Sequence, residues 1–287
     1  MISPRSDAGM SLFTLCPSRG VPLPANSQRV VYLFRLSGRT LATRLLVLPT
    51  GIELADYSDY SQTEPLYWAF TRAHLQARAG TGNRLLGELR LCRDLAELES
   101  VATVVFHLCD YSERNWHGTQ AECATLAGHL AGMVYEELGR WGVSKEITRR
   151  RMTQVQRGEE ADQAVFRFWL NKKDYAVRLR LSSDEGNDVP AREEPFALSA
   201  YPFSPGDVRL SRGVVGFDDI LQQVYPLVAR LRRRRCLDDH DGGTVCGELV
   251  ACILLELDRL GIPFVARTLT NPSTCIRARD KWKLLPG

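Results

Sequence analysis

The sequence predicts an α+β fold of two lobes, each a β-meander followed by helices, with mainly antiparallel sheets. Two segments, 29–49 and 165–181, are rich in β-branched and aromatic residues on either side of a short polar turn, as β-hairpins are. Apolar residues at helical spacing follow each hairpin. The two hairpins also resemble each other, which raises the question of an internal pseudo-repeat.

The match between the hairpins contains no gap. Residues 31–47 align with residues 165–181 at an offset of 134, and the same residue occurs at six of the 17 positions. A further strand candidate follows each hairpin, at 51–57 and at 196–203. Duplication of one unit explains the match, and so does convergence of two amphipathic hairpins on similar residues. The sequence leaves both explanations open.

The other elements follow from apolar periodicity and turn residues. We expect an irregular, proline-rich leader at 1–28, an N-terminal lobe at 29–142 and a C-terminal lobe at 143–287. Residues 101–109 are apolar on both faces apart from His107, which predicts a central strand. The expected helices are 63–80, 83–100, 119–139, 144–157, 217–235 and 243–260, and late strands are expected at 263–269 and 274–284.

Composition narrows the class of protein. The chain has 287 residues, of which 44% are hydrophobic and 25% are charged, as in globular proteins. Its net charge is only +3, so nucleic-acid binding would depend on local clusters of cations. No apolar stretch has the length of a membrane span, and we expect a cytoplasmic protein without a membrane partner. Reduced thiols are expected at four apolar positions, Cys109, Cys123, Cys246 and Cys252.

The second hairpin carries the main functional signal. Strand alternation directs Phe166 and Val177 toward the core and predicts that the opposite face is open to solvent. That face combines arginines with an indole, and lysines lie at the turn. This combination is typical of binding to single-stranded nucleic acid, where bases stack and phosphates pair with cations. The residues are Arg167, Trp169, Lys172, Lys173, Arg178 and Arg180.

Two more arginine-rich segments lie in the C-terminal half, in the helix expected at 144–157 and at the end of the helix expected at 217–235. The leading hypothesis is a non-catalytic or accessory protein that binds nucleic acid or a ribonucleoprotein through a surface shared with the second hairpin. The alternative for each run is a solvated helix end whose cations interact with the helix dipole. The arginines concerned are Arg149, Arg150, Arg151, Arg230, Arg232, Arg233, Arg234 and Arg235.

Two other functions stay open. A protein-binding scaffold, or a chaperone-like pseudo-dimer, would present its two lobes to a partner. An enzyme would use the loop expected at 110–119, where Asp110, Arg114 and His117 supply a carboxylate, a cation and an imidazole. No familiar catalytic or nucleotide-binding motif accompanies these residues, so an enzyme is the less favoured hypothesis and no cofactor is expected. No group of cysteines and histidines has a recognised ligand spacing, so no metal site is expected.

Overall fold

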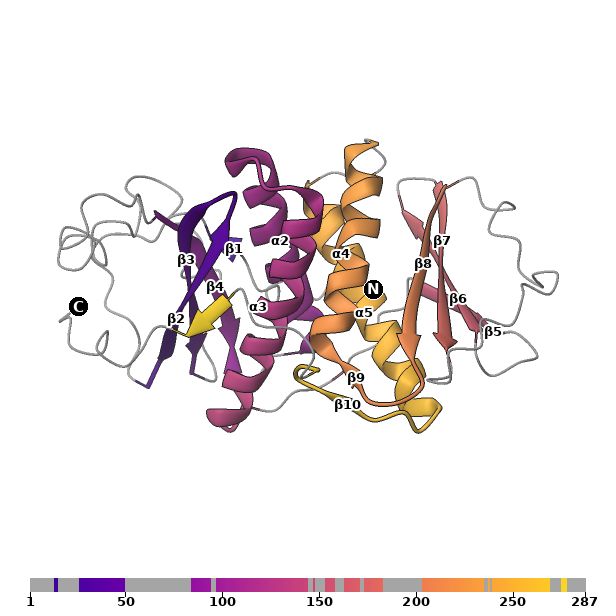
Figure 1. The fold of residues 1–287 in the computed structure, drawn as a ribbon. Helices are drawn as coiled ribbons and strands as arrows, with labels where there is room; N and C mark the ends of the chain where they lie inside the picture. The colour runs from indigo at the N-terminus through magenta and orange to yellow at the C-terminus, as the bar shows by residue number, and fades with distance from the viewer. Residues whose placement is uncertain are drawn as a thin grey trace, which may run out of the picture.

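Two sheets form the outer layers of the molecule, and helices fill the space between them (Figure 1). The computed structural model describes residues 13–14, 26–49, 84–93, 97–143, 147, 153–157, 163–170, 173–182, 203–234, 237, 239–268 and 275–277. Across the molecule the order is sheet, two helices, two helices, sheet. The α+β class predicted from the sequence is confirmed.

The N-terminal half of the chain builds most of the first sheet. β2 (Gln28–Leu36) and β3 (Arg39–Leu48) form an antiparallel hairpin whose turn, Ser37 and Gly38, has positive φ at both residues. β4 (Arg84–Cys92) runs parallel to β3, and the short β1 (Phe13–Thr14) pairs with the outer edge of β4. The sheet is therefore mixed, because its third strand is parallel to the second.

The second sheet repeats this arrangement. β6 (Gln163–Leu170) and β7 (Lys173–Ser182) form an antiparallel hairpin, and β8 (Phe203–Ser211) runs parallel to β7. β5 (Thr153–Arg157) pairs antiparallel with β6 and forms the other edge. Both sheets have a register irregularity in the parallel pair, next to Thr43 in β3 and next to Val177 in β7.

Each half contributes two long helices. α2 (Leu98–Trp116) and α3 (Gln120–Arg140) cover the first sheet, and α4 (Phe217–Arg233) and α5 (Asp239–Arg259) cover the second. The two pairs then pack against each other, α2 on α5 and α3 on α4. A helix in this position has apolar neighbours on two sides, which explains why its apolar residues cover more than one face.

We call residues 28–157 and 163–277 the two halves of the chain. With this division, the last strand of each half lies in the sheet of the other half. β5 follows α3 and pairs with β6, whereas β11 (Cys275–Arg277) follows α5 and pairs with β2. Before reaching β2, the chain forms β10 (Phe264–Val265), which pairs in parallel with β9 (Val215–Gly216). The two halves are thus joined by exchanged strands as well as by packed helices.

Four element predictions were wrong, wholly or in part. The strand predicted at 101–109 lies inside α2, and so does much of the loop predicted at 110–119. The segment 101–109 is apolar on all sides because it is buried between a sheet and other helices. A buried helix and a buried strand share this pattern, so the pattern does not distinguish them. The helical pattern at 83–100 is mostly β4, and the end of the helix predicted at 144–157 is β5.

Other predictions agree with the structure or lie outside it. The helices predicted at 119–139, 217–235 and 243–260 correspond to α3, α4 and α5, and α4 stays continuous through Pro226. The four cysteines expected to be reduced are buried free thiols. The leader apart from residues 13–14 and 26–28, the strand candidate at 51–57, the helix predicted at 63–80 and Arg149 to Arg151 lie outside the described residues.

Candidate functional site

The two sites that the sequence suggested separately, the acidic segment after residue 109 and the arginine run after residue 229, meet in the structure. Asp110 lies on α2 and is almost fully buried. Its carboxylate forms ion pairs with Arg114 at 2.9 Å, one turn along the same helix, and with Arg232 of α4 at 2.5 Å. The charge of Arg232 is therefore directed into the junction between the two halves of the chain.

A second carboxylate of α2 completes this cluster. Glu113 accepts from the hydroxyl of Tyr225 at 2.6 Å and from Arg233 at 2.8 Å, and both donors lie on α4. Burial raises the pKa of Tyr225, and the nearby thiol Cys109 and thiol Cys123 act in the same direction. The phenol is consequently a neutral hydrogen-bond donor. We call Asp110, Glu113, Arg114, Tyr225, Arg232 and Arg233 the junction cluster.

The thiol beside this cluster is unsuited to nucleophilic chemistry. Burial, with a smaller effect of the Glu113 charge, raises the pKa of Cys123 to about 12. A thiol with such a pKa stays protonated at neutral pH, and the thiolate is the nucleophilic form. His117 ends α2 in the left-handed region with φ of 56° and is exposed, and its carbonyl accepts from Ser37. Of the three residues considered for catalysis, Asp110 and Arg114 thus form an ion pair, and His117 caps the end of α2.

The outward face of the second hairpin holds paired cations. Arg178 is buried at 4% exposure and donates two hydrogen bonds of 3.0 Å to Asp207 of β8. Arg180 pairs with the same carboxylate at 3.0 Å. Arg167 pairs with Asp174 at 2.5 Å across the hairpin. The four predicted residues do share one face, but the arginines on it are neutralised by carboxylates of the same sheet.

Trp169 differs from its neighbours on that face. It is 60% exposed, next to the hairpin turn, opposite Asp174. Lys172 lies outside the described residues, and the side chain of Lys173 is also outside them. The indole is therefore the feature of this face that the described structure leaves accessible to a partner.

The remaining arginines of the run differ in their contacts. Arg230 donates to the carbonyl of Pro205 at 2.8 Å, at the edge of β8. Arg234 ends α4 and is exposed, with its backbone amide bonded to the carbonyl of Arg230. Arg235, like Arg149 to Arg151, lies outside the described residues. Among the predicted cations, the described structure places Arg232 and Arg233 at the junction of the halves and Arg167, Arg178 and Arg180 on the second sheet.

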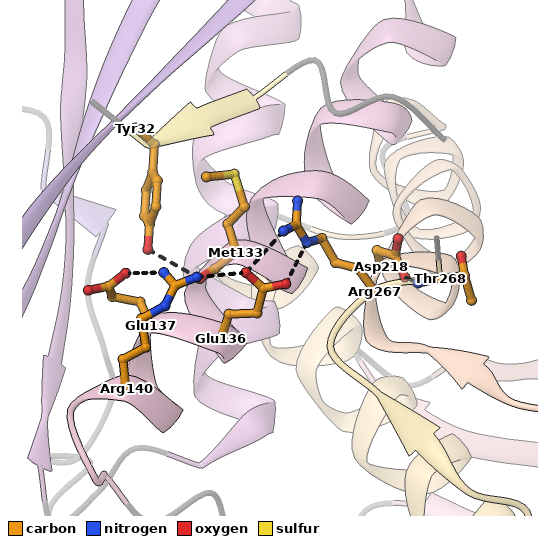
Figure 2. A network of polar contacts seen from close by, with 8 residues as sticks. All are labelled: Tyr32, Met133, Glu136, Glu137, Arg140, Asp218, Arg267 and Thr268. Carbon is orange, nitrogen blue, oxygen red and sulfur yellow. Dashed lines mark hydrogen bonds and ion pairs between the residues drawn. The ribbon is translucent and has the colours of Figure 1, made fainter. Parts of the chain in front are cut away.

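A polar network that the sequence analysis missed ties the end of the chain to the N-terminal half (Figure 2). Arg267, which follows β10, donates to both oxygens of Glu136 on α3, at 2.8 and 3.0 Å. On the next turn of α3, Arg140 pairs with the buried Glu137 at 2.7 Å, and Tyr32 of β2 donates to the carbonyl of Met133 at 3.3 Å. Spacing along the chain carries no signal for the Arg267–Glu136 and Tyr32–Met133 contacts, because these partners are distant in sequence.

The same segment contacts the start of α4. Asp218 is buried and accepts from the backbone amide of Thr268 at 3.1 Å, while Asp219 accepts from the amide of Gly216 at 3.2 Å. Burial, together with the neighbouring charge of Asp219, raises the pKa of Asp218 to about 6. The start of α4 therefore holds a carboxyl group that changes charge near neutral pH.

The described residues contain no cluster of three or more His, Cys, Asp or Glu side chains arranged to hold a metal ion. Within those same ranges, no helix combines the length and the apolar character needed to cross a membrane. Comparison with known protein families, with curated proteins and with solved structures found no match. Functional inference therefore depends on the geometry of this chain.

Proposed function

We propose that the chain is a non-catalytic protein-binding module, a single-chain pseudo-dimer that docks a protein partner at the Trp169 end of the β6–β7 hairpin. The observation that carries this proposal is a 60% exposed indole beside arginines that already have carboxylate partners. Tryptophan is enriched among the residues that dominate protein interfaces, because it buries a large area with few rotatable bonds. Trp169 is one of three exposed large hydrophobic residues in the described part of the chain, with Val214 and Val265.

The pairing of the arginines favours a protein partner over a nucleic acid. A phosphate group that approached Arg178 would compete with Asp207 for the two hydrogen bonds that Arg178 donates, and would meet the charge of that carboxylate. The same holds for Arg232 and Arg233, whose partners lie in the junction cluster. Nucleic-acid binding remains the second candidate, because an exposed indole also suits base stacking.

The test compares three forms of the full chain: the natural protein, Trp169→Ala and Val214→Ala. Each is recovered from cells of its source under native conditions, and co-purifying proteins are quantified by mass spectrometry. We expect at least one stoichiometric protein that Trp169→Ala reduces tenfold or more and Val214→Ala retains. Equal recovery of every co-purifying protein with Trp169→Ala would refute the proposed site.

A parallel measurement separates the two candidates. Fluorescence anisotropy with single- and double-stranded RNA and DNA probes at low salt should detect no binding. Binding that weakens steeply with salt, as counterion release requires, and that Trp169→Ala abolishes would instead support the nucleic-acid hypothesis. The salt dependence of binding distinguishes the two candidates, because binding at a protein interface centred on an apolar ring responds weakly to ionic strength.

A further inference from the structure

The two halves of the chain agree in length as well as in order. β4 and β8 begin and end 119 residues apart, and so do α3 and α5. The first residues of α2 and α4 have the same separation. The hairpins are 134 residues apart instead, because the connection between β3 and β4, 49–83, is longer than the connection between β7 and β8, 183–202.

α3 and α5 also share residues and an ending. Both contain a buried glutamate paired with an arginine three residues later at 2.7 Å, Glu137 with Arg140 and Glu256 with Arg259. Both end at a glycine with positive φ, 63° at Gly142 and 68° at Gly261. At the spacing of 119, the identical residues are Thr125 and Thr244, Gly128 and Gly247, Leu130 and Leu249, Glu137 and Glu256, Leu138 and Leu257, Arg140 and Arg259, and Gly142 and Gly261.

The contacts between the halves are reciprocal. A Cβ atom on Gly128 of α3 would lie 2.5 Å from the carbonyl oxygen of Asp218, at the start of α4. A Cβ atom on Gly247 of α5 would lie 2.7 Å from the carbonyl oxygen of Glu99, at the start of α2. Glu99 and Asp218 are themselves 119 residues apart. In each half, therefore, the matching glycine packs against the matching first turn of a helix in the other half.

Reciprocal contacts of this kind define a twofold axis. Phe106 of α2 and Tyr225 of α4 occupy matching positions, and their ring centroids are 5.5 Å apart. Matching residues of two copies touch each other only close to the axis that relates the copies. The axis therefore passes between α2 and α4, and the junction cluster lies one to two turns further along these helices.

Only between unlike halves are all the charge contacts near the axis complementary. Asp110 and Glu113 of α2 match Ala229 and Arg232 of α4, and Arg114 matches Arg233. Two N-terminal halves would place Asp110 against Glu113, where Arg232 now lies, while Glu113 would keep a cation opposite it, Arg114 in place of Arg233. Two C-terminal halves would place Arg232 against Arg233. Like charges at an interface oppose association, so this divergence discriminates against pairing of like halves.

We propose that residues 28–157 and 163–277 are two copies of one structural unit, that they pair about a twofold axis with exchange of their last strands, and that the junction cluster makes the pairing selective for unlike halves. The interaction surface is the α2–α5 and α3–α4 face together with the junction cluster, and its partner is the other half of the same chain. This inference deepens the pseudo-dimer part of the proposed function and does not depend on the docking of a partner at Trp169.

The experiment uses the full chain with a protease site inserted between Arg157 and Gln163. After folding and cleavage, native mass spectrometry should find one complex of an N-terminal and a C-terminal fragment. Mixing with an isotopically labelled cleaved sample should yield exchanged complexes of unlike fragments only. Fragments that separate on cleavage would overturn the shared interface, and complexes of two like fragments would overturn its selectivity.

The contribution of the junction cluster is measured in the same cleaved protein. Arg232→Glu with Arg233→Glu should weaken the fragment complex at least tenfold at low salt, whereas Arg35→Glu, a reversal at an exposed position of β2, should leave it unchanged. If the double variant does not fold, Arg233→Met and the dissociation of the natural complex at rising salt provide the test. Dissociation that is insensitive to Arg233→Met and to salt would overturn the role of the cluster.

Discussion

The ring centroid of Phe106 lies 5.5 Å from that of Tyr225, and the two residues occupy matching positions of α2 and α4. Both side chains are fully buried. The centre of the molecule is therefore made by both halves together, and the same core residues contact α2, α4 and their partners. A substitution in this region is expected to affect the stability of both halves at once.

Replacement of Asp207 should show how much this carboxylate stabilises the fold by pairing with the buried Arg178. Asp207→Asn leaves the charge of Arg178 buried without its carboxylate, and we expect a loss of about 3 kcal/mol in the free energy of unfolding. Urea denaturation at neutral pH measures this value. Arg180→Met removes the second, more exposed partner of Asp207 and should cost under about 1 kcal/mol. Equal losses for the two variants would contradict this assignment.

The raised pKa of Asp218 predicts an unusual pH dependence of stability. In the unfolded chain the carboxyl titrates near its ordinary value of 3.8, whereas in the folded protein it titrates at about 6. Between these values the folded state binds more protons, so this group makes stability fall as pH rises from 4 to 6.

Asp218→Asn removes the charge and retains an oxygen that accepts from Thr268. We expect this variant to be more stable than the natural protein at pH 7, by roughly 2 kcal/mol, and to lose that advantage near pH 4. Thermal unfolding across this pH range measures the effect. A constant difference between the two proteins at every pH would show that the substitution acts through packing instead.

The matched glycines predict matched effects. Gly128→Ala and Gly247→Ala each force a methyl group against a backbone carbonyl of the opposite half, and we expect each to cost about 1 to 3 kcal/mol. Gly139→Ala, at an exposed position of α3, should be neutral or stabilising by up to about 1 kcal/mol, because alanine favours helix. Denaturant unfolding of the three variants makes the comparison, and a stabilising effect at either buried glycine would be inconsistent with close helix packing.

Among the described residues, the outer edge of β8 contacts a side chain and no further strand. Gln223 of α4 accepts from the amide of Arg209 at 2.6 Å and donates to the carbonyl of the same residue. At the matching edge in the first sheet, β1 pairs with β4. Side-chain capping of this kind prevents an exposed edge from pairing with other chains.

Gln223→Ala should open this edge. We expect hydrogen exchange of the Arg209 amide to accelerate roughly tenfold, while the amides of the β6–β7 hairpin keep their protection. Gln223→Glu keeps the acceptor for that amide and should preserve most of its protection. Unchanged exchange at Arg209 in Gln223→Ala would mean that another group protects the edge.

Local pattern was enough to predict the second hairpin. Its alternation directs Phe166 and Val177 inward, and both are fully buried. The pattern also identified the face shared by Arg167, Trp169 and Arg178. It was uninformative about exposure of the arginines, because Asp207 reaches Arg178 from β8, which follows a separate connection of the chain.

α2 shows why some elements were misassigned. Val101, Val104 and Val105 favour a strand locally, and the segment is apolar on all sides. Burial between β4 on one side and α5 on the other removes the amphipathic signal that identifies a helix. The spacing of 119 that relates α3 to α5 is present in the sequence, but the offset of 134 between the hairpins conceals it.

The sequence by itself determined the class of the fold, the inward face of the second hairpin, the positions of α3, α4 and α5, and the presence of an arginine run at 232–235. These features depend on residues that are close together along the chain, where periodicity and propensity operate. Only the tertiary structure decided that Arg232 and Arg233 meet Asp110 and Glu113, and that β5 and β11 are exchanged between the halves. Ion pairs and strand partners depend on distances in space. The partners of Arg232, Arg233 and β11 lie more than 100 residues away along the chain, and local sequence carries no record of them.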